Sequence, residues 1–215
     1  MTDSFSSKMY KIFIQARMSS KRFPGKVLAS FNGVPIIKCV IDRILNVVPI
    51  GQIVVLASQE ESDDPLACYL DQLGVATFRG SLDNVFTRFK KCLEEYPCEW
   101  FVRLCADSPL LDYEPLKSML TLTEKKGLDL VTNVFPRTYP KGQSIEIVRA
   151  KTFKHIDNDI LSPLQQEHVT KVYYDQSDQY QIFNVESTGE NRSGLNYSVD
   201  TIEDLYKLQE IYNLI

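Results

Sequence analysis

The chain has 215 residues, a formal net charge of -4, 44% hydrophobic residues and 24% charged residues, a composition typical of a globular protein with a substantial core. No stretch approaches the roughly 20 apolar residues that cross a bilayer, and the mild negative charge disfavours a general nucleic-acid binder. The five cysteines form no CxxC pair, so we expect buried free thiols in a cytoplasmic protein rather than disulfides or a zinc site.

Apolar runs alternate with segments of helical periodicity along the chain, which predicts an α/β fold with a mainly parallel sheet. Strands are expected at residues 10–16, 52–58, 75–78, 100–105, 128–132, 144–149, 179–185 and 196–199. Helices are expected at residues 35–47, 65–73, 82–96, 113–126 and 163–174, and from Thr201 onward. We expect a flexible segment at residues 1–9 and one domain at residues 10–215, in which residues 134–150 form a dimerisation or acceptor-side arm.

A cationic loop follows the first predicted strand. Its four basic residues are Arg17, Lys21, Arg22 and Lys26. No acidic residue occurs between Asp3 and Asp42. Open α/β sheets bind ligands at the carboxyl edge of their strands, where fixed positive charges suit a triphosphate and the charge that develops when it is cleaved. Neither the glycine-rich phosphate loop nor the dinucleotide-binding fingerprint is present, which disfavours both of those classes.

Two aspartates also follow predicted strands. Asp107 comes after the strand at residues 100–105, and Asp200 comes after the strand at residues 196–199. Mg²⁺ is usually bound by one or two carboxylates together with phosphate oxygens and water, so the pair predicts a magnesium-triphosphate site. The ordinary alternative is a turn or helix-capping role for each aspartate, and for Asp200 the two roles are compatible.

The loop and its surroundings resemble a known family. Residues 14–28 (IQARMSSKRFPGKVL) resemble the opening motif of the CMP-sugar synthetase superfamily. The match is best to the branch that holds the spore-coat polysaccharide protein F and acylneuraminate cytidylyltransferase-like proteins. Further blocks follow in the family's order, at residues 79–88, 103–112, 139–146, 166–170 and 197–205. Six blocks in register cover nearly the whole chain.

The resemblance implies a Rossmann-like nucleotidyltransferase fold, a GT-A-like three-layer sandwich that is usually homodimeric. It implies Mg²⁺-dependent transfer of CMP from CTP to an acidic sugar of the nonulosonate or 3-deoxy-octulosonate type, for surface polysaccharide biosynthesis. The implied nucleotide-binding residues are Gln15 and Ala16 near the base, with Arg17, Ser20, Lys21, Arg22, Lys26, Arg103 and Asp107. The implied catalytic residues are Arg17, Lys21, Lys26, Asp107 and Asp200, of which the two aspartates hold the metal. The implied acceptor-side residues are Arg79, Asp83, Glu146 and His168, each of which also has an ordinary structural alternative.

Some readings stay open at this point. Asn196 stands where relatives often have an arginine near the sugar. A second hypothesis therefore keeps the reaction but changes the acceptor to a phosphonate, a polyol phosphate or another sugar acid. A GT-A glycosyltransferase is disfavoured because Cys105 replaces the first residue of its Asp-x-Asp metal motif. A non-catalytic CTP-binding protein is disfavoured by Lys21, Asp107 and Asp200 together. The sequence reveals no general base.

Overall fold

The fold was obtained as a computed structural model, and it describes residues 10–213. The segment predicted to be flexible, residues 1–9, lies outside the described residues. The strands of the main sheet are β1 (Tyr10–Gln15), β4 (Ile53–Ser58), β5 (Ala76–Gly80), β6 (Trp100–Cys105), β7 (Leu130–Thr132), β8 (Glu146–Arg149) and β9 (Ile182–Asn184). They lie in the order β5-β4-β1-β6-β8-β7-β9. β8 runs antiparallel to both of its neighbours, and the other pairs are parallel. The expected mainly parallel α/β sheet is therefore confirmed.

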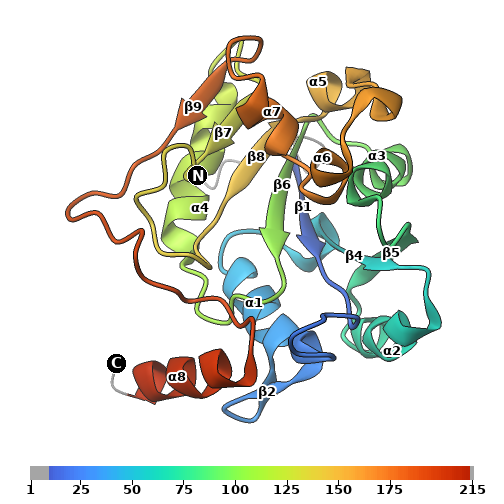
Figure 1. The fold of residues 1–215 in the computed structure, drawn as a ribbon, viewed down its shortest axis with the longest axis vertical. Helices are drawn as coiled ribbons and strands as arrows, with labels where there is room; N and C mark the ends of the chain where they lie inside the picture. Colours follow the sequence, from blue (N-terminus) through green and yellow to red (C-terminus); the bar gives the residue numbers. More distant parts are fainter. Residues whose placement is uncertain (1–9, 214–215) are drawn as a thin grey trace.

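Helices cover both faces of this sheet (Figure 1). The described helices are α1 (Ile36–Ile44), α2 (Asp64–Gln72), α3 (Val85–Glu95), α4 (Tyr113–Leu120), α5 (Ala150–His155), α6 (Pro163–Glu167), α7 (Lys171–Asp175) and α8 (Ile202–Asn213), of which α8 lies away from the sheet. Because successive side chains of a strand point to opposite faces, Ile12 and Ile14 join a core cluster with α1, α2 and α4. Phe13 instead joins a second cluster with α3, α5 and α7. The result is a three-layer sandwich.

A third, smaller cluster lies away from the main sheet. It joins α8 to α1 and to the two-stranded ribbon of β2 (Ser30–Phe31) and β3 (Val34–Pro35). The connection from β9 to α8 runs down one side of the molecule, in orange-red at the left of Figure 1, and α8 lies at the opposite end from α5 and α7. This route carries Asp200 back to the N-terminal loop.

Several predicted elements are wrong in detail. The helix expected at residues 163–174 is two short helices, α6 and α7, which are separated because His168 leaves the helical region (φ -104, ψ 86). Thr170, between the two helices, is buried, and its hydroxyl donates to Glu146 Oε1 at 2.5 Å. The helix expected at residues 113–126 ends at Leu120 and continues as a 3-10 turn, Thr121–Glu124.

The strand expected at residues 196–199 is also wrong. Asn196 forms a single bridge with Lys141, and its Oδ1 accepts hydrogen bonds from Ser198 N and Ser198 Oγ at 3.0 and 2.7 Å. Such a side-chain contact to the backbone two residues ahead turns the chain away from an extended ladder. The helix α5 and the β2–β3 ribbon had no counterpart among the predicted elements.

Candidate active site

The site begins at the carboxyl ends of two central strands. β1 and β6 are parallel neighbours in which Gln15 pairs with Cys105. The residues that follow each strand therefore leave the sheet at the same edge, the place where open α/β sheets bind ligands. Ala106 N donates to Gln15 O at 3.0 Å and keeps the two chain exits side by side.

The cationic loop is fixed at its base by backbone contacts. Gly25 adopts a positive φ of 74°, which glycine tolerates without strain, and its N–H donates to Met18 O at 2.8 Å. Met18 N in turn donates to Asp63 Oδ1 at 2.7 Å, and Ser58 N donates to Asp63 Oδ2 at 2.7 Å. The buried Asp63 thus ties the loop to the end of β4. Nothing in the sequence singled it out, although it follows a predicted strand as Asp107 does.

The two aspartates from separate strand ends converge on one lysine. Lys26 Nζ lies 2.8 Å from Asp107 Oδ2, 3.2 Å from Asp200 Oδ1 and 2.7 Å from Val199 O. Burial alone would lower the pKa of Lys26, but the charges and hydrogen bonds of both carboxylates outweigh it and raise the pKa. The ammonium group is therefore held charged between the two carboxylates.

Asp200 contacts two further cations. Lys141 Nζ lies 2.6 Å and Arg22 Nη2 3.1 Å from Asp200 Oδ2. Partial burial would raise the pKa of Asp200, but Lys141 and Lys26 outweigh it and lower the pKa to about 2. The helix-capping role falls instead to Thr201, whose Oγ1 accepts from Asp204 N at 3.3 Å, while Asp204 Oδ2 accepts from the backbone N–H groups of Asp200 and Thr201 at 3.0 and 2.9 Å.

The opposite wall contains a buried ion pair. Arg103 pairs through Nη1 with Glu146 Oε2, and Arg103 Nη2 donates to Gln15 Oε1 at 3.2 Å. Glu146 Oε1 also accepts from Tyr174 Oη at 2.6 Å, in addition to Thr170. Burial raises the pKa of Glu146, but Arg103 and the two hydroxyls outweigh it and hold the pKa below its usual range. Glu146 is only 3% exposed and its oxygens are engaged, which does not match the expected contact with an acceptor; it orients Arg103 instead.

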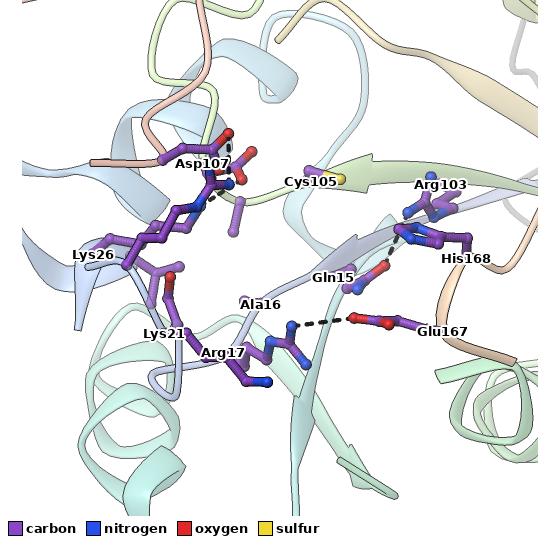
Figure 2. Close-up of a pocket in the computed structure, with 15 residues that line it drawn as sticks. Gln15, Ala16, Arg17, Lys21, Lys26, Arg103, Cys105, Asp107, Glu167 and His168 are labelled. Atoms are coloured by element: carbon purple, nitrogen blue, oxygen red, sulfur yellow. Dashed lines mark hydrogen bonds and ion pairs between the residues drawn. The ribbon is translucent and has the colours of Figure 1, made fainter. Parts of the chain in front are cut away.

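A cavity of about 430 Å³ lies between these two walls. Figure 2 shows Lys26 and Asp107 on one side, Arg103 and His168 on the other, and Lys21 and Arg17 between them. Arg17 Nη2 lies 3.6 Å from Glu167 Oε1. The predicted site residues that line the cavity are Gln15, Ala16, Arg17, Ser20, Lys21, Arg22, Lys26, Arg103, Asp107, His168 and Asp200.

Two predicted acceptor-side residues lie elsewhere. Arg79 and Asp83 line a separate cavity of about 810 Å³ beside β5 and α3. Arg79 Nη1 pairs with Asp64 Oδ1 at 2.6 Å, and Arg79 Nε and Nη2 donate to the carbonyls of Ser58 and Glu60, each at 2.8 Å. The structure therefore separates both residues from the two aspartates, because β5 is the edge strand of the sheet and points this loop outward.

A smaller cavity of about 340 Å³ adjoins the main one and shares with it Cys105, Asp107, His168 and Asp200. Its other walls come from the end of β6 and the loop that follows it, from the predicted arm and from the segment before α8. The polar residues that they add are Arg137, Lys141, Ser144 and Ser198. Arg137 Nη1 and Nη2 donate to Ser144 Oγ at 3.1 and 3.0 Å, and no ion pair with Arg137 occurs within residues 10–213. This half-buried arginine was not among the predicted site residues.

Gly142 allows the arm to approach this cavity wall closely. Its φ is 90°, and a Cβ atom at this position would lie 2.5 Å from the carbonyl carbon of Tyr197. No L-residue with a side chain fits such a contact without moving the backbone. The glycine therefore fixes the distance between the arm and the segment that leads to Asp200.

The described cysteines are free thiols, as predicted. The prediction that all of them are buried is wrong. Cys68 is exposed. Burial raises the pKa of Cys98 to about 12 and that of Cys105 to about 11, and the thiolate is the reactive form. We expect iodoacetamide at pH 8 to alkylate Cys68 well before Cys98 or Cys105, measured by peptide mass spectrometry over time. Equal rates at Cys68 and Cys105 would contradict this burial.

The oxygen donors of Asp107, Asp200 and Val199 suit a hard divalent cation whose coordination shell is completed by a bound ligand. No group of three or more His, Cys, Asp and Glu side chains that could hold a metal occurs among the described residues. Asp107 and Asp200 nevertheless already converge on one cation, together with the carbonyl oxygen of Val199. Mg²⁺ is commonly held by one or two carboxylates while phosphate oxygens and water complete its shell. The residues present fit that pattern.

Comparison with known proteins gives consistent matches. The family model described as cytidylyltransferase matches residues 12–214. The spore coat polysaccharide biosynthesis protein SpsF of Bacillus subtilis is 29% identical over 205 residues, which cover 93% of this chain and 84% of that protein. A 3-deoxy-manno-octulosonate cytidylyltransferase of Rhizobium etli is 26% identical over 165 residues, with coverages of 76% and 62%. A solved cytidylyltransferase of Leptospira borgpetersenii superposes with a TM-score of 0.89 at 28% identity, covering 96% of this chain and 87% of that one. The resemblance inferred from the sequence motifs is confirmed.

None of the described helices is both long enough and apolar enough to span a membrane.

Proposed function

Since this chain belongs to the cytidylyltransferase family, we propose that it transfers CMP from CTP to an acidic sugar and releases pyrophosphate. The observation that carries the proposal is the cavity in which Asp107 and Asp200 converge beside a loop of four basic residues. Such a site can bind a triphosphate and neutralise the charge that moves onto the leaving pyrophosphate, which is most of what phosphoryl-type transfer requires of a protein.

Different residues around the cavity bind different parts of CTP in this proposal. Lys21 and Arg22, which are exposed, and Arg17, which is half-buried, line the cavity and bind the phosphates in this proposal. Arg103 donates to the side-chain oxygen Oε1 of Gln15, which leaves the side-chain amide N–H groups of Gln15 to contact the base in this proposal. In the proposed reaction a hydroxyl of the acceptor attacks the α-phosphorus in line with the departing pyrophosphate.

Asp107 and Asp200 would hold Mg²⁺ in this proposal. A bound Mg²⁺ supplies Lewis-acid stabilisation of phosphate oxygens and orients the phosphate chain. The pKa of Asp200 is lowered to about 2, mainly by Lys141 and Lys26, so this carboxylate is ionised as a metal ligand must be. The basic side chains would then act on the phosphates themselves.

The adjoining cavity supports an acceptor that carries a negative charge. It opens from the aspartate pair, so an acceptor hydroxyl placed there lies close to the phosphates. Arg137 is anchored by Ser144 and forms no ion pair within residues 10–213. A planar guanidinium of this kind suits the bidentate recognition of a carboxylate or a phosphate. This feature favours a sugar acid and keeps the polyol phosphate and the phosphonate as competing acceptors.

Replacing Arg137 with methionine is expected to raise the KM for the acidic acceptor about ten- to a hundredfold, since a hydrogen bond to a charged group contributes about 1.5–3 kcal/mol. The KM for CTP should change little, because Arg137 lines only the adjoining cavity. Steady-state kinetics with each substrate varied in turn measures both. Arg192→Met, at an exposed loop arginine, is the matched control. Equal changes in both KM values would contradict the assignment.

The proposed reaction is tested by measuring pyrophosphate release from each of four nucleoside triphosphates. The acceptors are a panel of nonulosonic and octulosonic acids, each beside its reduced or esterified neutral counterpart, with and without Mg²⁺. Release that requires CTP, an acidic acceptor and Mg²⁺ supports the proposal. Release with polyol phosphates alone would move the activity to the second acceptor class, and CTP binding without any release would leave only a nucleotide-binding protein.

A homodimer stays a prediction from the family, and residues 134–150 stay a predicted dimerisation or acceptor-side arm. Phe135 in this arm is 40% exposed and stacks on Tyr174 with ring centroids 4.9 Å apart. Light scattering with size-exclusion chromatography measures the mass in solution.

A further inference from the structure

Lys26 already makes the contacts of a cation with three oxygen ligands. Its Nζ touches one oxygen of Asp107, one oxygen of Asp200 and the carbonyl oxygen of Val199, all within 3.2 Å. Its side chain is 11% exposed. Within residues 10–213, it is the one basic side chain that pairs with both aspartates. The lysine therefore holds together two carboxylates that would otherwise repel each other.

The net positive charge around these carboxylates weakens the binding of a divalent cation. Three cationic side chains, Lys26, Lys141 and Arg22, lie within ion-pair distance of the two aspartates, so the group carries one net positive charge. A divalent ion added to this group would meet an ammonium within a few ångströms of its own ligands. Like charges a few ångströms apart repel even at the effective dielectric constant of a protein surface, and we expect this repulsion to lower the metal affinity by at least about tenfold.

The ammonium group of Lys26 can reach a second position, beside a triphosphate bound in the cavity. Its backbone is pinned, since Lys26 N donates to Phe23 O at 3.2 Å and Ala29 N donates to Lys26 O at 3.0 Å. Its side chain, however, lines the same cavity as Lys21 and Arg17. A triphosphate in that cavity would offer the ammonium new anionic partners within the reach of a four-carbon side chain.

We propose that Lys26 is a stand-in cation that keeps Asp107 and Asp200 together and is exchanged for the metal when the nucleotide enters. The ammonium then moves from the carboxylates to the phosphates, and the incoming negative charge of the triphosphate offsets the added positive charge. Metal and nucleotide consequently bind with strong positive coupling, and the free protein binds the metal weakly. This inference rests on the proposed CTP and metal site but does not depend on which acceptor is used.

The test measures the affinity of the full chain for Mn²⁺ by calorimetry and by electron paramagnetic resonance. Mn²⁺ is used as a paramagnetic substitute for Mg²⁺. Wild type is expected to bind Mn²⁺ weakly alone, and at least about tenfold more tightly with CTP present and no acceptor. Lys26→Met should bind Mn²⁺ alone at least about tenfold more tightly than wild type, because the competing charge is gone. Lys26→Arg keeps the charge and should bind as weakly as wild type. Lys38→Met, which removes a surface lysine paired with Asp42 on α1, is the matched control and should change nothing.

The gain in metal affinity separates this inference from a structural role, since a damaged site loses affinity. Wild type that binds Mn²⁺ alone as tightly as Lys26→Met would overturn it, and so would Mn²⁺ affinity that does not respond to CTP. If Lys26→Met fails to fold, as judged by circular dichroism, Lys26→Gln takes its place, because it also removes the ammonium charge while keeping a polar side chain. Pyrophosphate release is scored separately: absent turnover with coupled Mn²⁺ and CTP binding would reject the proposed reaction and keep the exchange.

Discussion

Replacing Asp107 or Asp200 with alanine is expected to lower the rate of pyrophosphate release by about a hundredfold to a thousandfold, the range found when one preorganised electrostatic contact to a transition state is removed. Each change removes one of the two carboxylates that share a cation in the cavity. Initial rates at saturating CTP and acceptor measure the loss.

The fold should survive both changes, because the two side chains lie at the cavity surface rather than in a core cluster. Thermal unfolding of each variant checks this. Asp42→Ala, on the exposed side of α1, removes a carboxylate that also pairs with a lysine and should retain the full rate. Near-normal turnover in both active-site variants would show that these aspartates do not hold the metal.

Replacing Glu146 with alanine is expected to lower the free energy of unfolding by about 3–5 kcal/mol, because it leaves the guanidinium of Arg103 buried without its partner. The side chains of Arg103 and Glu146 are 13% and 4% exposed. Denaturant unfolding measures the change. The matched control is Glu99→Ala, which breaks an exposed pair with Arg149 at 3.7 Å and should lower the free energy by at most about 1 kcal/mol.

The double variant Arg103→Met with Glu146→Leu should lose less stability than Glu146→Ala, since no buried charge is left unpaired. The contribution of Glu146 also depends on pH. Because its folded-state pKa lies below the ordinary value of 4.5, the contribution is full above that value and is lost as the pH falls through the folded-state pKa. Equal losses for Glu146→Ala and Glu99→Ala would contradict a stabilising buried pair.

The sequence predicts well the features that depend on neighbouring residues. The strand Trp100–Cys105 has its predicted bounds, because an unbroken apolar run identifies a strand that is buried on both faces. The position of the basic loop and of Asp107 follows in turn, since parallel neighbours end at one edge of the sheet.

The parts that sequence reasoning missed depend on contacts between distant segments. Lys26 lies 81 residues from Asp107 and 174 residues from Asp200, and no local pattern shows that one ammonium bridges both. The pairing of Arg103 with Glu146 follows from the antiparallel register of β8 on β6, whereas an isolated Glu in a strand suggests an exposed face. Arg79 was assigned to the acceptor by motif alone, but the outer position of β5 carries it away.

The two adjoining cavities share the aspartate pair but take their remaining walls from different stretches of chain. The basic loop after β1 walls the larger one, and the arm that contains Arg137, Lys141 and Ser144 walls the smaller one. Mutations in the arm can therefore alter which partner molecule is accepted while the nucleotide side stays intact. Within such a scaffold, substrate preference can diverge through evolution, or be transplanted by exchanging this one stretch, without rebuilding the machinery that cleaves the triphosphate.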